Sequence, residues 1–160
     1  MMTRIKNTAA AVFFLLFHMQ CGYAHGLSTQ TTQNEQHNAI LHYVNQYRAK
    51  YHLQPLKLLP MISAEASTHS VHMAKKSVPF GHQQFQLRMR RLSQRIPFCR
   101  GGAENVAYYR TNAKQLVDAW MASPGHRQNI LGHYNVTGIG IAYDKRGWAY
   151  YTQIFLRTVA

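Results

Sequence analysis

Cysteine, acidic side chains and long apolar runs are all scarce in this chain of 160 residues. The two cysteines, Cys21 and Cys99, have the spacing of neither a zinc knuckle nor a redox pair, so we assign no chemistry to them. The apolar run Ala9–Phe17 is too short to cross a bilayer as a helix, which needs about 20 residues. The sequence therefore predicts no transmembrane helix in the mature chain.

Acidic residues number only five, against 18 lysines and arginines, and the formal net charge is +13. Such an excess attracts nucleic acid, acidic polysaccharide and phospholipid headgroups without sequence specificity. The basic residues are scattered, apart from the cluster at 88–91. Two interpretations stay open, an electrostatic binder of an anionic surface and a charge that serves solubility. We expect no specific recognition of nucleic acid.

Residues 1–24 have the features of a secretory signal peptide. Arg4 and Lys6 precede the apolar run, and small residues at 22 and 24 stand where a signal peptidase reads them. We predict cleavage after residue 24 and an exported protein, extracellular or periplasmic. The alternative is a lipoprotein anchored at Cys21, which follows the apolar run at a suitable distance.

The rest of the chain has the length of one domain. We predict a flexible polar lead-in at 25–35, followed by a domain at 36–158. Apolar residues at three- and four-residue spacing predict helices at four places. These segments are 33–50, 61–76, 84–96 and the one that starts with the capping box Asn112–Gln115.

Between and after these helices the pattern changes. The segment 53–60 is expected to be an extended connector, 99–102 a turn, and 103–109 a strand or a loop. Residues 136–143 and 148–156 alternate with period two around a turn at 144–147, which predicts a β-hairpin. Helices followed by a hairpin indicate an α+β domain in which helices cover an antiparallel sheet.

The helix that contains Trp120 runs into Ser123-Pro124-Gly125. The Ser123 hydroxyl suits an N-cap and Pro124 the first helical position, so one helix stops and another starts. His126 then occupies the third position, where the positive helix end disfavours its protonated form. A neutral imidazole can bind a metal ion or accept a proton, and the alternative is a structural histidine that orders the kink.

Two further residues stand where the backbone turns sharply. His82 follows Gly81 after a helix end, and Glu104 follows a pair of glycines in a chain with few carboxylates. A glutamate in that setting indicates a polar site. The alternative for Glu104 is a salt bridge to one of the many arginines.

Seven successive segments resemble blocks of the CAP superfamily, the cysteine-rich secretory, antigen 5 and pathogenesis-related proteins. The segments are LHYVNQYRAKYHLQPL, AEASTHSVHMA, FGH, GGAENVA, AWMASPGHRQNIL, GIGIAY and YYTQIF. The resemblance covers about Ile40–Leu156 and is closest to compact single-domain bacterial members. It implies an α-β-α sandwich, with a central antiparallel sheet covered by helices on both faces, and a large open cleft.

The resemblance also implies a cleft with two histidines and two acids, in which several family members bind a divalent metal such as zinc. The matching positions here are His82, Glu104 and His126, whereas Ser123 replaces the second acid. Asp118 is near, but on a different helix face. A His-Glu-His set with water in the fourth place remains an open zinc site, with His82 and His126 as its metal ligands.

The expected function is binding of a lipid, a glycan or other cell-wall component, or a protein, at this His/Glu cleft. The alternative is a protease-like hydrolase in which Glu104 or His126 activates water, with or without metal. A serine nucleophile at Ser123 is disfavoured because no acid is evident to orient His126. Met73, Met89 and Met121 suit either an apolar groove or, more often, the core.

Overall fold

The structure is a computed structural model, and it describes residues 32–159. The predicted signal peptide and Cys21 lie outside the described residues. The chain is helical from residue 32, the first that is described, to residue 50. The last four residues of the predicted lead-in are therefore helical. Within residues 32–159, no helix is long and apolar enough to cross a membrane.

Four strands form one sheet in the order β1-β3-β4-β2. Their bounds are β1 Lys57–Leu58, β2 Cys99–Tyr109, β3 Val136–Tyr143 and β4 Ala149–Thr158. The predicted hairpin is confirmed as β3 and β4, and β2 pairs antiparallel with β4 along nearly its whole length. The segment predicted as an extended connector contributes the short edge strand β1. This strand pairs parallel with β3.

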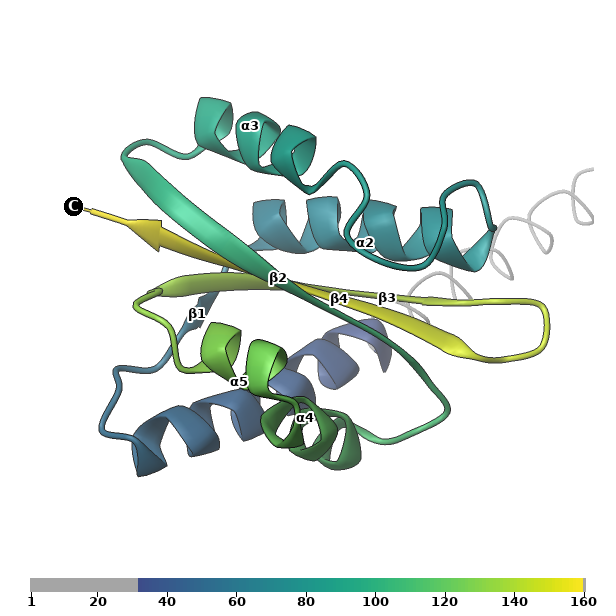
Figure 1. The fold of residues 1–160 in the computed structure, drawn as a ribbon, viewed down its shortest axis with the longest axis horizontal. Helices are drawn as coiled ribbons and strands as arrows, with labels where there is room; N and C mark the ends of the chain where they lie inside the picture. Colours follow the sequence, from purple (N-terminus) through teal and green to yellow (C-terminus); the bar gives the residue numbers. More distant parts are fainter. Residues whose placement is uncertain (1–31, 160) are drawn as a thin grey trace, which may run out of the picture. The chain divides into compact units, whose positions relative to one another are not determined.

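One face of the sheet is covered by α2, Pro60–Ala74, and α3, Phe85–Arg95 (Figure 1). Alternation along β3 turns Gly138 and Gly140 toward α2. A Cβ at Gly138 would overlap the backbone of Ile62, and one at Gly140 the backbone of Ala66. Hydrogen in place of a side chain therefore lets α2 lie directly on the sheet.

The other face is covered by residues 36–50 of the first helix, by α4, Ala113–Ala122, and by α5, Pro124–Ile130 (Figure 1). The larger apolar cluster lies here and includes Ile40, Val44, Leu116, Trp120 and Phe155. The structure therefore has the predicted α+β architecture, with helices on both faces of the sheet.

Two local predictions are wrong. Residues 99–102 belong to β2, where a shift of register between Cys99 and Gly102 bulges the strand instead of ending it. Ser123 is the N-cap of α5 and Pro124 follows it, as predicted, but the Ser123 side chain makes no capping hydrogen bond. The predicted capping box of α4, between Asn112 and Gln115, is present.

Candidate functional site

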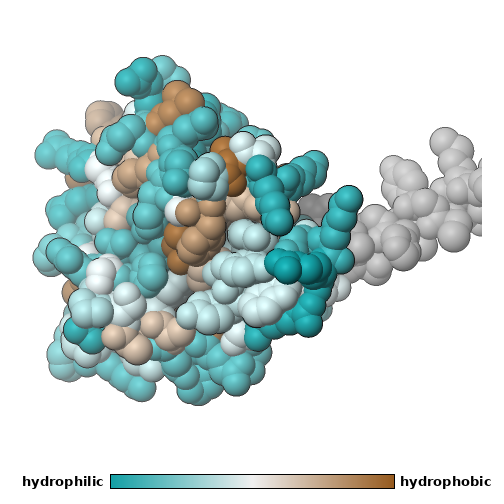
Figure 2. All heavy atoms as spheres, turned by 45° about the vertical axis from the view of Figure 1, so that its right-hand side comes forward, coloured by the Kyte–Doolittle hydropathy of each residue, from teal (hydrophilic) through white to brown (hydrophobic). Residues whose placement is uncertain are grey.

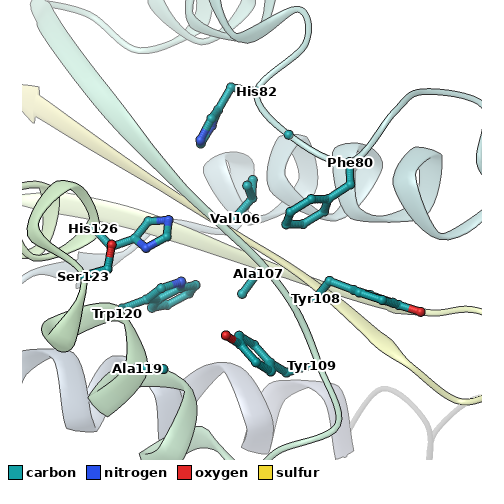
Figure 3. Close-up of a pocket in the computed structure, with 11 residues that line it drawn as sticks. Phe80, His82, Val106, Ala107, Tyr108, Tyr109, Ala119, Trp120, Ser123 and His126 are labelled. Carbon is teal, nitrogen blue, oxygen red and sulfur yellow. The ribbon is translucent and has the colours of Figure 1, made fainter.

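A pocket of about 580 Å³ opens at the β2 edge of the sheet. Three elements line it, namely the loop after α2, the second half of β2, and the junction of α4 with α5 (Figure 3). The lining residues are Phe80, Gly81, His82, Val106, Ala107, Tyr108, Tyr109, Ala119, Trp120, Ser123 and His126. The structure thus brings His82, Ser123 and His126 to one pocket, from segments far apart in the sequence.

Glu104 lies just behind the pocket wall and is held by two partners. Arg88 donates from Nε to Oε2 at 2.8 Å and from Nη2 to Oε1 at 2.7 Å. His82 Nδ1 lies 3.0 Å from Oε1, and because an ionised carboxylate only accepts, His82 donates there. Glu104 therefore forms the salt bridge to an arginine that the sequence left open as an alternative. Its geometry is bidentate, which is typical of strong arginine–carboxylate pairs.

This environment keeps Glu104 ionised. Burial raises its pKa, but the hydrogen bonds from His82 and Arg88 and the charge of Arg88 outweigh burial, and the net shift is downward. A carboxylate with a lowered pKa is a weak proton acceptor. Glu104 therefore orients His82 well, but it is poorly suited to activating water.

His69 closes the network on the side away from the pocket. Arg88 Nη1 lies 3.2 Å from His69 Nδ1 and donates to it, since arginine cannot accept. His69 Nε2 then donates to the carbonyl of Gly81, at 2.8 Å. The loop that carries His82 is thereby tied to the buried Arg88 from both sides.

His126 and Ser123 lie side by side on the opposite wall, with the Trp120 ring beneath them (Figure 3). The ring centroids of Trp120 and His126 are 6.4 Å apart. Burial lowers the pKa of His126, and the nearby His82 lowers it further. The predicted neutral imidazole agrees with this direction, although burial is the larger cause. Trp120 is 2% exposed, and its Nε1–H has no hydrogen-bond partner among the described residues.

The other candidates lie away from the pocket. Asp118 accepts from Lys114 and from the Tyr47 hydroxyl, so it does not replace the missing acid. Met73 and Met121 are buried in the core. Met89 packs against the apolar cluster under α2 and α3, which favours the core interpretation for all three methionines.

The donor set fits a divalent ion only in part. Within residues 32–159, no three His, Cys, Asp or Glu side chains gather closely enough to hold a metal ion. Both Glu104 oxygens are already engaged, so the structure does not provide the expected His-Glu-His ligand set. His82 Nε2 and the His126 ring remain as candidate ligands, and a carboxylate behind a ligating histidine is the usual arrangement at metal sites.

Sequence reasoning missed Arg88, His69 and the aromatic wall. Arg88 belongs to what reads in the sequence as an exposed basic cluster, yet it is 3% exposed. The sequence pattern places His69 on the inward face of its helix but names no partner for it. The aromatic wall could have been predicted from Tyr108 and Tyr109, because these residues directly follow the segment that contains Glu104.

A sheet between two helical layers, with two histidines and a buried glutamate at an open cleft, defines the class of the cysteine-rich secretory domain. The family model described as "CAP: Cysteine-rich secretory protein family" matches residues 41–155. The chain belongs to this family, as its sequence motifs indicated.

Several known proteins are similar to this chain. YkwD of Bacillus subtilis (strain 168) is 33% identical over 123 residues, which cover 73% of this chain and 45% of that protein. The membrane protein YlbC of the same organism is 31% identical over 131 residues, covering 80% and 35%. The chain thus spans less than half the length of either relative.

Solved structures agree on the fold. An extracellular protein with an SCP domain from Bacillus anthracis str. Ames superimposes with a TM-score of 0.66 at 27% identity, covering 78% of this chain and 41% of that one. An outer surface protein from Borrelia burgdorferi gives a TM-score of 0.63 at 16% identity, covering 72% and 87%. The second likeness concerns the fold alone.

Proposed function

We propose that the chain is an exported binding domain whose ligand occupies the pocket between His82 and His126. The observation that carries this proposal is the pocket itself, where two imidazoles, a serine hydroxyl and aromatic rings face one open volume of about 580 Å³. Binding is favoured over hydrolysis because Arg88 neutralises Glu104 and lowers its basicity. Apolar walls with a few convergent polar groups are typical of ligand sites.

An NMR titration tests this proposal. Residues 25–160, labelled with ¹⁵N, are titrated separately with short acidic peptides, a chitin oligosaccharide and a micellar lysophospholipid. We expect one probe class to shift the amides of the pocket-lining residues, and His126→Ala to weaken that probe. The control is His133→Ala, a histidine outside the pocket. Shifts confined to other surfaces for every probe would refute a ligand site here.

We further propose that His82 and His126 hold a divalent ion such as zinc, with ligand or water atoms completing its shell. Bound zinc would supply a Lewis acid that attracts ligand oxygen atoms. Calorimetry should show one-to-one binding that disappears in the His82→Ala/His126→Ala variant. Unchanged heat in that double variant would place the zinc elsewhere, and no heat in the parent protein would reject the metal site.

Export is proposed from the predicted signal and from the similarity to the extracellular SCP-domain protein of Bacillus anthracis. Intact-mass analysis of the full chain expressed in a bacterium should give a secreted product that starts at residue 25. A product with a lipid on Cys21 would support the lipoprotein alternative instead.

A further inference from the structure

Strand β2 lies at an edge of the sheet, and its second half forms the floor of the pocket. Side chains of β2 point to the two helical layers in turn, with Val106 packing near Met73 on one side and Ala107 near Leu116 on the other. The third direction, away from β4, opens into the pocket (Figure 3).

The direction of the β2 backbone groups follows from two independent contacts. The Glu104 carbonyl accepts from Asn129 Nδ2 at 3.2 Å, so it faces away from β4. The N–H and C=O of one residue in an antiparallel strand point to the same side, and that side alternates along the strand. Val106 and Tyr108 therefore present their N–H and C=O to the pocket.

The register of the sheet, followed from the β1 edge, gives the same direction for the β2 backbone groups. The Thr137 carbonyl accepts from Leu59 N at 2.9 Å, so Thr137 faces β1. Its partner Phe155 then faces β2 and pairs there with Ala103. Counting along β2 from Ala103, residues 105, 107 and 109 also face β4, while 104, 106 and 108 face outward.

At residues 106 and 108 these outward groups have no partner within residues 32–159. No hydrogen bond from the described residues reaches the backbone N–H or C=O of Val106 or Tyr108. Unpaired edge groups of this kind are a template for another strand. Asn129 covers the edge at Glu104, which leaves the open stretch at 106–108, between α5 and the exposed Tyr109.

Trp120 supplies a second, independent sign of a ligand. Its side chain is almost fully buried, yet its indole N–H has no acceptor among the described residues. Figure 3 shows the indole nitrogen on the edge of the ring turned toward the space between His126 and Ala107. A buried N–H without a partner is costly, so an acceptor oxygen from a ligand would complete the site.

The charge of the pocket indicates which peptides suit it. The described residues that line the pocket include two imidazoles and no carboxylate, and Glu104 behind the wall is paired with Arg88. The chain as a whole carries +13. A segment with acidic side chains is therefore favoured by the overall charge, and it meets no carboxylate among the described lining residues.

We propose that the pocket binds an extended, acidic peptide segment, which adds a short strand to β2 through Val106 and Tyr108. This rests on the proposed binding function and names its ligand class. Backbone hydrogen bonds supply affinity in such strand addition, and pockets for alternate side chains supply specificity. Phe80 and Tyr109, both about half exposed, are placed to cover the flanks of the added strand.

The test uses a library of acetylated, amidated peptides of about seven residues with acidic residues at alternate positions. We expect members to bind with Kd below about 1 mM at low salt and to protect the Val106 and Tyr108 amides from hydrogen exchange. N-methylation of alternate residues on the paired edge should weaken the best peptide at least about tenfold, whereas N-methylation on the other edge should not.

Variants of the protein provide the matched comparison. Val106→Pro removes one outward N–H that the sheet does not use, and proline is tolerated at such edge positions. It should weaken the peptide about tenfold more than Val106→Ala does, because Val106→Ala changes the side chain but keeps the N–H. Circular dichroism verifies that both variants fold, and the N-methylated peptides decide the matter if Val106→Pro does not.

Three results would overturn the proposal. A library without a binder below about 1 mM rejects the peptide ligand. Equal affinity of peptides methylated on either edge shows that bound peptides do not extend the sheet. A glycan or lipid that alone shifts the pocket amides leaves the proposed function standing and removes only this inference.

Discussion

Arg48 is a fully charged side chain enclosed by the protein, at 2% exposure. Its guanidinium donates to four carbonyls, those of Gln54, Ile130, Gly132 and Tyr134, at 2.7–3.0 Å. No carboxylate among the described residues pairs with it. It therefore joins the first helix to the loop after α5 by carbonyl contacts alone.

We expect Arg48→Lys to lower the free energy of unfolding by about 3 kcal/mol, because one ammonium cannot reach four carbonyls and leaves several buried and unpaired. Urea denaturation measures the change. The comparison is Arg91→Lys, whose partner Glu65 and the arginine itself are partly exposed, and which should cost less than about 1 kcal/mol. Equal losses of stability in the two variants would show that the four carbonyl contacts of Arg48 contribute no more than a partly exposed ion pair.

His69 makes stability depend on pH. Burial lowers its pKa and Arg88 adds to that effect, and together they outweigh the opposing hydrogen bond with Gly81. A folded-state pKa below the unfolded value of 6.5 means that the unfolded chain binds the proton more tightly. The contribution of His69 is therefore complete above pH 6.5 and is lost as pH falls below it.

We expect the free energy of unfolding to decrease between about pH 7.5 and about pH 5.5, and to decrease less in His69→Gln. Glutamine can still donate to Gly81 and accept from Arg88, but it does not titrate in this range. Urea denaturation at several pH values gives both curves. Histidines such as His126, whose pKa is also lowered, contribute equally to both proteins. Parallel curves would exclude His69 as a source.

At the scale of elements, the contact of α2 with β3 depends on the two strand glycines. A Cβ at Gly140 would overlap the backbone of Ala66 and Ser67, which cannot move without lifting α2 from the sheet. A glycine with free space around it, Gly125 in α5, offers a control within the same chain, since a Cβ there meets nothing within 4 Å.

We predict that Gly140→Ala destabilises the protein by at least about 2 kcal/mol through overpacking. Gly125→Ala should be neutral or stabilising by up to about 1 kcal/mol, because alanine loses less backbone entropy in a helix. Thermal and urea unfolding compare the two variants. A stable Gly140→Ala protein would mean that α2 can shift at little cost.

At the scale of the whole molecule, most acidic side chains form ion pairs with basic side chains of the same chain. Four of the five lie in ion pairs with their own lysines or arginines, namely Glu65, Glu104, Asp118 and Asp144. Most of the lysines and arginines within residues 32–159 therefore have no acidic partner there. Figure 2 shows one face on which hydrophobic side chains form small groups among hydrophilic ones, which suits electrostatic more than apolar adsorption to a surface.

We expect the protein to adsorb to dextran sulfate with an affinity that falls about tenfold or more between about 50 and 200 mM salt. Neutral dextran is the control and should not retain the protein. Retention that salt does not change would argue against an electrostatic mode. Peptide binding in the pocket should weaken less over the same range, since backbone pairing carries most of it.

The sequence alone determined most of the elements and the residues His82, Ser123 and His126 that meet at the pocket. Period 3.6 and period two mark helices and strands locally, and Ser123-Pro124 restarts a helix by its own chemistry, so His126 could be placed at the third helical position. The motifs around His82, Glu104 and His126 were specific enough to name the family. These features depend on neighbours in the chain, and a sequence displays such neighbours directly.

Only the tertiary structure decided what those residues can do. Arg88 reaches Glu104 across two segments, and this contact changes the glutamate from a candidate base into an anchor for His82. Strand β2 became an edge strand with open backbone groups because β4 pairs on one side of it alone. Ion pairs and sheet order depend on distances between residues remote in sequence, and no local pattern encodes those distances.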